Sequence, residues 1–171
     1  MCDLLCALAP ATAAGVTLFA KNSDRPPIER QVVERHPPRA ESCTRTTYLD
    51  IDGPAEDTFA FTGSRPDWMW GVEHGVNEAS VAVGNAAIYT TLDPRPFPDA
   101  LTGMDLVRLA LERAASATHA VEVIDTLIQR YGQGGSGHEG ARRPYWSSFL
   151  VADPGGALWW RRRGRLWPSS P

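Results

Sequence analysis

The hydrophobic pattern of this 171-residue chain changes its period at a proline-rich connector, Asp93-Pro-Arg-Pro-Phe-Pro98, and this change limits the folds available to it. Before the connector, apolar residues lie in short runs with strand character, separated by Pro, Gly and Asp clusters. After it, apolar residues recur at helical spacing between 102 and 130. Strands followed by a pair of helices are typical of a layered α+β fold, and the length suits one domain.

The first two apolar runs predict a β-hairpin, formed by Cys2 to Leu8 and Val16 to Asn22. If Leu8 pairs with Val16, antiparallel register places Cys2 opposite Asn22 and beside Lys21-Asn-Ser-Asp24. A second hairpin is predicted from 68–74 and 79–89, which flank Gly75-Val-Asn-Glu78. The remaining predicted strands are 31–35, 46–51, 58–62 and 146–152, the last followed by a turn at Asp153-Pro-Gly-Gly156.

Two helices are predicted between the connector and the last of these strands. Thr102-Gly-Met-Asp105 resembles a capping box with Asp in the Glu position. The first helix has one apolar stripe, formed by Met104, Val107, Leu111 and Ala114. The second runs from about Thr118 to Arg130 and ends at Gly132.

Composition excludes several classes of partner. With 17 basic and 20 acidic residues, the net charge of -3 provides no broad basic surface, so no nucleic-acid partner is expected. No apolar run reaches the roughly 18 residues of a membrane span, so no membrane association is expected. Three cysteines are too few for a disulfide framework, and Asp3 is atypical of a signal peptide; both points favour the cytoplasm.

Cys2 is the first candidate for chemistry, because a cysteine directly after the initiator Met becomes the N-terminal residue once Met1 is removed. One residue then has both a thiol and an α-amino group, and an amine with a pKa near 8 can act as general base for the thiol. The alternative is a small residue in an edge strand. Cys6 shares its face of the strand, where a packed core thiol is favoured over a metal ligand. No metal site and no cofactor are expected.

Eight motifs in the same order along the chain resemble those of the secernin and bacterial dipeptidase family, cysteine hydrolases of the N-terminal-nucleophile (Ntn) superfamily. The motifs are Cys2-Asp-Leu-Leu-Cys-Ala-Leu8, Thr17-Leu-Phe-Ala-Lys-Asn-Ser-Asp-Arg-Pro26, Arg65-Pro-Asp-Trp-Met-Trp-Gly71, Gly75-Val-Asn-Glu78, Val83-Gly-Asn85, Leu101-Thr-Gly-Met-Asp105, Tyr131-Gly-Gln-Gly-Gly135 and Ser147-Ser-Phe-Leu-Val-Ala-Asp-Pro154. The resemblance implies an αββα sandwich and a small peptide as substrate. Association into a homo-oligomer is left open.

The resemblance also implies catalytic roles for four residues. Cys2 would attack the amide carbonyl to form a thioester, and Lys21, the one lysine in the chain, would favour the thiolate and orient the substrate. Asp24 would position the free α-amino group; an Asx-turn is the alternative. Asn85 would donate a hydrogen bond to the oxyanion; a strand-end turn residue is the alternative.

Three further residues, Asn22, Trp68 and Trp70, are candidates for substrate binding. The two tryptophans have strand spacing on one face, and such residues are more often part of a core than of a site.

Members of this family are longer than this chain, and the pattern departs from theirs after Asp153-Pro154. Residues 1–157 are therefore interpreted as the N-terminal part of an Ntn-hydrolase domain, with an incomplete sandwich, and 158–171 as a divergent tail rich in Arg and Trp. Three hypotheses follow: a cysteine dipeptidase, an inactive fragment or binding module of the same family, and a non-peptide amide hydrolase or acyltransferase on the same scaffold.

Overall fold

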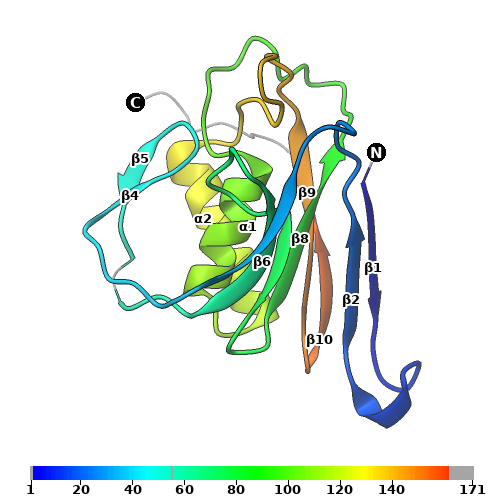
Figure 1. The fold of residues 1–171 in the computed structure, drawn as a ribbon. Coiled ribbons are helices and arrows are strands. Elements are labelled where there is room, and N and C mark those ends of the chain that lie inside the picture. Colours follow the sequence, from blue (N-terminus) through cyan, green and yellow to red (C-terminus); the bar gives the residue numbers. More distant parts are fainter. Residues whose placement is uncertain (1, 55, 162–171) are drawn as a thin grey trace.

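The computed structural model describes residues 2–54 and 56–161 and divides them into three layers (Figure 1). In this described part, the central layer is a six-stranded antiparallel sheet with the order β10-β9-β8-β7-β6-β3. Its strands are β3 (Gln31–His36), β6 (Phe61–Pro66), β7 (His74–Asn77), β8 (Ala82–Ile88), β9 (Trp146–Asp153) and β10 (Gly156–Trp160). Four of the six strands, β3, β6, β7 and β8, lie in the strand-rich part of the sequence before the proline-rich connector.

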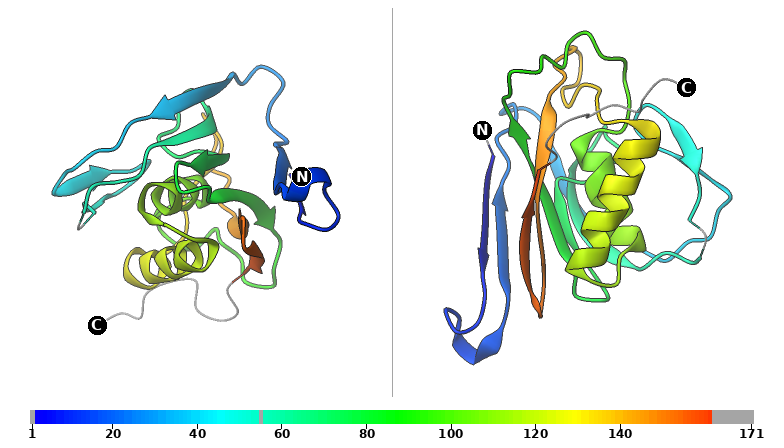
Figure 2. Two further views of the ribbon diagram at one scale, coloured as in Figure 1. Left: turned by 90° about the horizontal axis from the view of Figure 1, so that it is seen from below. Right: turned by 180° about the vertical axis from the view of Figure 1, so that it is seen from behind.

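The helices and the N-terminal hairpin lie on opposite sides of this sheet (Figure 2). Helices α1 (Gly103–Arg113) and α2 (Ala117–Tyr131) cover one face, and β1 (Asp3–Ala7) with β2 (Leu18–Asn22) lies against the other. A small hairpin of β4 (Cys43–Arg45) and β5 (Asp50–Asp52) lies beside the helices. The core fills the space between helices and sheet and includes Leu106, Leu109, Ile124, Phe149 and Val151. The prediction of a layered α+β fold is confirmed.

Both predicted helices are present, and their ends have the expected physical causes. The Thr102 hydroxyl accepts the backbone N–H of Asp105 at 3.0 Å, and the Asp105 carboxylate accepts that of Thr102 at 2.9 Å, so the capping box is complete. The predicted apolar stripe of α1 is fully buried. Helix α2 ends at Gly132, which has a positive φ of 79°. No helix in the described part of the chain combines the length and the apolar character required to cross a membrane.

The N-terminal hairpin is confirmed, but the predicted register is wrong by one residue. Asn22 pairs with Asp3, and Lys21 pairs with Leu4. The prediction counted from Leu8 and Val16, yet both lie outside the strands, in a connection that contains a short 3-10 turn at Ala13–Gly15. A shift of one residue changes which side chains share a face. Leu4 therefore shares the inner face with Lys21, whereas Asn22 lies on the outer face.

The strand predicted at 46–51 is wrong, because its centre is the turn between β4 and β5. The Thr46 hydroxyl donates to the Leu49 carbonyl at 2.8 Å and so fixes that turn. The strand predicted at 58–62 begins too early: β6 starts at Phe61, because the backbone N–H groups of Thr58 and Phe59 donate to Arg39 and Glu112, outside the sheet.

The second hairpin is present but displaced along the chain. Residues 68–73 form a turn region instead of a strand, and Gly75-Val-Asn77 belongs to β7 instead of the connection. This strand position needs a glycine, because a Cβ there would lie 2.5 Å from the Thr62 carbonyl oxygen and 2.8 Å from a Leu111 methyl group. The connection to β8 instead contains Ser80, whose φ is 64°.

The last strand, β10, crosses the boundary predicted at residue 157. Its residues Leu158 to Trp160 pair with β9 and so belong to the central sheet. Most of the predicted tail, residues 162–171, lies outside the described residues.

Candidate active site

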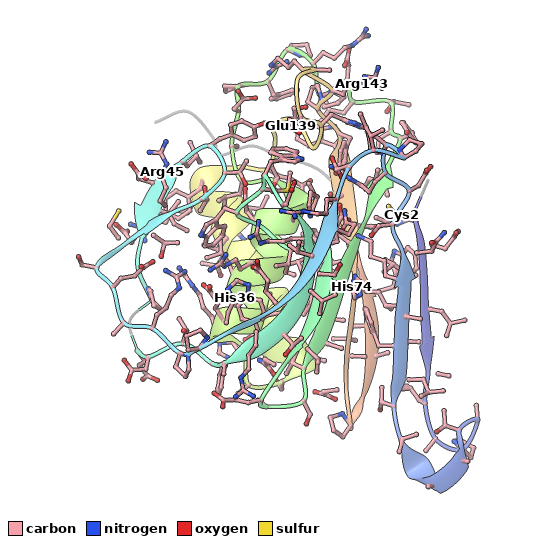
Figure 3. The ribbon with its side chains drawn as sticks, viewed as in Figure 1. Cys2, His36, Arg45, His74, Glu139 and Arg143 are labelled. Carbon is pink, nitrogen blue, oxygen red and sulfur yellow. The ribbon has the colours of Figure 1, made fainter. Side chains whose placement is uncertain are left out.

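Alternate residues of β2 and the segment after it point toward the central sheet. Lys21, Ser23 and Arg25 are partly buried, whereas Asn22 and Asp24 are exposed. Cys2, at the start of the neighbouring strand, is partly buried too and lies at the end of the hairpin (Figure 3). The register thus brings Lys21 to the inner face, and it leaves Asn22 and Asp24 on the solvent side.

Lys21 forms the centre of a buried polar cluster. Its side chain has no exposed surface, and its ammonium group donates to the Glu73 carboxylate, to the Glu73 carbonyl oxygen at 3.0 Å and to Asn85 Oδ1 at 3.0 Å. These three acceptors match the three N–H groups of an ammonium. A buried cation needs such compensation, because desolvation otherwise destabilises its charged form.

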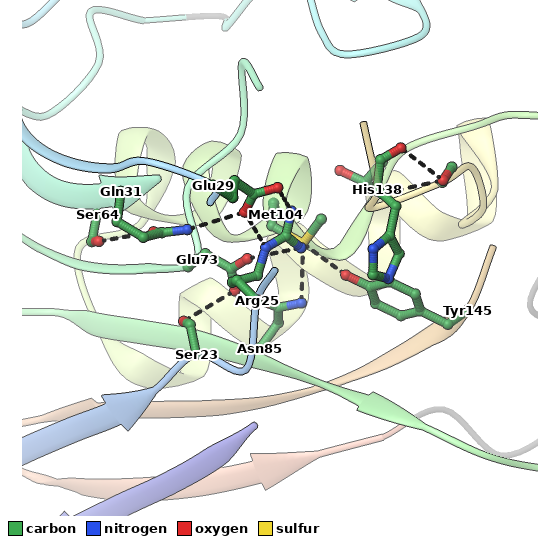
Figure 4. Close-up of polar contacts among 12 residues, drawn as sticks. Ser23, Arg25, Glu29, Gln31, Ser64, Glu73, Asn85, Met104, His138 and Tyr145 are labelled. Atoms are coloured by element: carbon green, nitrogen blue, oxygen red, sulfur yellow. Dashed lines mark hydrogen bonds and ion pairs between the residues drawn. The ribbon is translucent and has the colours of Figure 1, made fainter. Parts of the chain in front are cut away.

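Glu73 contacts all three inward-facing residues of this strand and its extension. Its Oε2 binds Lys21 and accepts from the Ser23 hydroxyl at 3.4 Å, and its Oε1 lies 3.4 Å from Arg25 Nη1 (Figure 4). The side chain is 3% exposed. Sequence analysis did not identify Glu73; the available signal was an acidic residue between apolar neighbours, immediately before a strand.

Arg25 links this cluster to Glu29 (Figure 4). The guanidinium makes a bidentate contact with the Glu29 carboxylate, with Nη2 at 2.7 Å from Oε2, and the Trp68 indole donates to the same carboxylate at 3.1 Å. Although burial raises the pKa of Glu29, the hydrogen bonds from Arg25 and Trp68 more than compensate, so this pKa is lower than usual.

The two candidate tryptophans do not share a location. Trp68 is at the edge of the polar cluster, through Glu29. Trp70 packs against the helix-side core, with the Arg108 guanidinium 4.1 Å from its ring centroid. The expectation that both tryptophans lie on one face of a strand is wrong, because both residues lie in a turn region where strand alternation does not apply.

Burial raises the pKa of the Cys2 thiol, and charged neighbours modify this effect in both directions. Lys21 and Arg25 lower the pKa, whereas Glu73 raises it. Burial also raises the pKa of Cys6, in the strand that begins directly after Cys2. Of these two thiols, Cys2 is the one whose pKa charged neighbours change, and at neutral pH its raised pKa favours the protonated form.

The amide group of Asn85 is oriented by Lys21. An ammonium can only donate, so the atom facing it must be the amide oxygen. The Asn85 NH2 group consequently faces Ser147 Oγ at 3.3 Å and Met104 Sδ at 3.4 Å, in a side chain that is buried. The structure places Asn85 beside Lys21. The NH2 group of Asn85, which was expected to donate to the oxyanion, faces Ser147 and Met104 instead.

Tyr145, just before β9, has a buried hydroxyl that donates to Met104 Sδ at 3.3 Å (Figure 4). Burial raises its pKa, and Glu73, Arg25 and Cys2 are among the groups that act on it electrostatically. A sulfur atom is a weak acceptor, so this neutral phenol keeps hydrogen-bonding capacity near Cys2. Sequence analysis did not identify Tyr145.

A groove of about 610 Å³ separates β2 from the outer face of the central sheet. Its apolar lining includes Phe19, Val33 and Val76, and His74 lies at the position next to Glu73. Burial lowers the pKa of His74, which favours neutral imidazole at pH 7. Residues 2–54 and 56–161 contain no group of three or more His, Cys, Asp or Glu side chains arranged to hold a metal ion.

No protein-family model matches this sequence. Among solved structures, the chain is similar to the C2A variant of conjugated bile acid hydrolase from Clostridium perfringens, with a TM-score of 0.59 and 16% sequence identity. The match covers 93% of this chain and 47% of the hydrolase, so the chain spans about half the length of that enzyme. A second variant of the same hydrolase matches with a TM-score of 0.48, 14% identity and coverage of 75% of this chain and 39% of the other. From the first match, the chain has the fold of an Ntn hydrolase, in incomplete form.

Proposed function

We propose that this chain contains the nucleophile of a cysteine amide hydrolase, with Cys2 as that nucleophile and a dipeptide as the substrate. One observation carries the proposal: in an Ntn-hydrolase fold, the cysteine at position 2 lies in the electrostatic field of Lys21, Glu73 and Arg25. The similar bile acid hydrolase is a C2A variant, so that enzyme also has a cysteine as its second residue.

The chemistry follows from a thiol and an α-amino group on one residue. After removal of Met1, the α-amino group takes the thiol proton and the sulfur attacks the amide carbon. The C–N bond breaks, the proton passes to the leaving amine, and a thioester remains. Water then cleaves the thioester, which releases the carboxylic acid and restores the thiol. Dipeptides are favoured because the motifs from Cys2 to Pro154 resemble those of the dipeptidase family.

The test compares hydrolysis of a dipeptide panel by the wild-type chain, Cys2→Ala and Cys6→Ala. Cys6 is a matched control, because it lies in β1, the strand that begins directly after Cys2, and is also partly buried. We expect turnover by the wild type and Cys6→Ala and none by Cys2→Ala. Equal turnover by Cys2→Ala would refute the role of Cys2.

A second candidate is hydrolysis of a non-peptide amide with a bulky apolar acyl group. The groove between β2 and the central sheet favours it, because the groove is lined by Phe19, Val33 and Val76. Adding a glycine-conjugated bile acid to the panel separates the candidates: cleavage of the conjugate without cleavage of any dipeptide selects the second.

The inactive-fragment alternative is supported by the match to only half of the solved enzyme. Intact mass measured before and after a limiting dose of iodoacetamide, with mapping of the label, distinguishes it. An activated nucleophile predicts loss of Met1 and, at a pH high enough to ionise the Cys2 thiol with its raised pKa, labelling of Cys2 ahead of Cys6 and Cys43. Equal labelling of the three thiols supports the fragment.

A further inference from the structure

The Glu73 carboxylate contacts three alternate residues in β2 and in the segment that follows it. It binds the Lys21 ammonium, accepts from Ser23 and lies within ion-pair distance of Arg25. It comes from a different layer, because residue 73 directly precedes β7 of the central sheet, whereas Lys21 belongs to the hairpin. Glu73 therefore connects the two layers where β2 ends, through Lys21 and Ser23 (Figure 4), and Cys2 lies at this same end of the hairpin (Figure 3).

The same contacts leave Lys21 without a free donor. Its three N–H groups have three acceptors, two of them on Glu73 and the third on Asn85, and its side chain has no exposed surface. Lys21 in this arrangement therefore acts on Cys2 through space and not through a hydrogen bond. What Cys2 experiences is an ion pair, whose field is much weaker than that of an isolated ammonium.

The positive charge of Arg25, the second cation near Cys2, is also compensated by carboxylates. Its guanidinium forms a bidentate pair with Glu29 and lies 3.4 Å from Glu73. Tyr145 is a neutral phenol with a raised pKa, so it adds no charge near neutral pH. The charged groups that act on the thiol are thus the chain's α-amino group, Glu73 and these two cations, and each of the two side-chain cations has a carboxylate partner.

We infer that Glu73 is a positioning residue that controls the charge state of Cys2: by pairing with Lys21 and Arg25 it holds both cations in place and keeps the sulfur protonated at rest. The direction agrees with the electrostatics at Cys2, where Glu73 raises the thiol pKa and the two cations lower it. The inference rests on the proposed role of Cys2 as nucleophile, and it adds a residue that sets the pH at which this nucleophile forms.

The test is the pH dependence of iodoacetamide labelling at Cys2, read by peptide mapping from roughly pH 6 to 10, a range that includes the usual thiol pKa. Glu73→Gln keeps the size of the side chain but removes its charge, so the midpoint should fall by about one pH unit. Glu73→Asp keeps the negative charge, so its labelling midpoint should be close to that of the wild type. Lys21→Met should raise the midpoint. Labelling of Cys6 in the same samples is the internal control and should not shift.

An unchanged midpoint in folded Glu73→Gln overturns the inference, and so do equal shifts in Glu73→Gln and Glu73→Asp, which indicate a purely structural role. If circular dichroism shows that Glu73→Gln does not fold, Lys21→Met is compared with Lys21→Met/Glu73→Gln, which removes the buried pair completely. A lower midpoint in the double variant supports the inference, and equal midpoints overturn it. Because labelling requires no turnover, a chain that shows these shifts but cleaves no amide refutes the proposed function and leaves the role of Glu73 standing.

Discussion

At the scale of single residues, the direction in which a side chain points decides whether a motif residue can take part in the site. Lys21 and Asn22 are neighbours in one motif, yet the side chain of Lys21 is fully buried beside Glu73 and Asn22 is exposed on the other face. Asn85 is another example, because the ammonium of Lys21 fixes the orientation of its amide. The sequence identified these residues as candidates, but not which of their atoms face the nucleophile.

Tyr145 offers a prediction at this scale. Its hydroxyl donates only to Met104 sulfur among the hydrogen bonds described for it, and a substrate oxyanion is a much stronger acceptor. If amide hydrolysis is observed, we expect Tyr145→Phe to lower kcat/KM by about 100-fold, the effect of removing one oxyanion donor. The measurement is steady-state hydrolysis of the best dipeptide.

Two controls separate this role from a structural one. The rate of Cys2 alkylation should remain that of the wild type, because the nucleophile is intact. The free energy of unfolding should change by less than about 1 kcal/mol, because the lost hydrogen bond to sulfur is weak. Wild-type kcat/KM in Tyr145→Phe would exclude the hydroxyl as an oxyanion donor.

At the scale of secondary-structure elements, local signals predicted the helices better than the strands. The start of α1 is encoded by four consecutive residues, Thr102 to Asp105, which satisfy their own backbone groups. The register of the β1–β2 hairpin has no such local determinant, because a ten-residue connection, residues 8–17, separates the two strands. Strand pairing depends on partners that are distant in sequence, and a shift of one residue exchanges the two faces.

The capping box gives a prediction at this scale. Thr102→Ala removes the acceptor for the Asp105 N–H at a buried helix start, so the free energy of unfolding should fall by about 1 kcal/mol. Urea denaturation followed by circular dichroism measures the change. Thr118→Ala, at an exposed position of α2, is the control and should have little effect. Equal losses in both variants would show that the cap does not stabilise α1.

At the scale of the whole molecule, the hairpin layer carries apolar side chains on both faces. Leu4 and Phe19 point inward, whereas Leu5 and Leu18 are 57% and 54% exposed on the outer side. Val33, on the outer face of β3, is 74% exposed. Strands that are apolar on both faces are typical of a layer covered on both sides. This agrees with a chain that spans about half of the solved hydrolase to which it is similar.

The exposed apolar surface predicts strong binding of a hydrophobic dye such as ANS. Leu18→Thr combined with Val33→Thr should reduce ANS fluorescence while changing the free energy of unfolding by no more than about 0.5 kcal/mol per site, because both side chains are largely exposed. Ile28→Thr, at a position 96% exposed in a loop, is the matched control and should leave dye binding nearly unchanged. Dye binding equal to that of an intact globular protein would contradict this view of the surface.

By itself, the sequence determined the class of fold, the two helices with their ends, the N-terminal hairpin and the candidacy of Cys2, Lys21 and Asn85. These features depend on local periodicity, on capping chemistry and on ordered motifs, all of which are contained in short stretches of chain. Only the tertiary structure decided the hairpin register, the separation of Trp68 from Trp70 and the contacts of Glu73 with Lys21, Ser23 and Arg25. The physical reason is that a buried ion pair forms where two layers meet, and residues 21 and 73 become neighbours only when the hairpin packs against the central sheet.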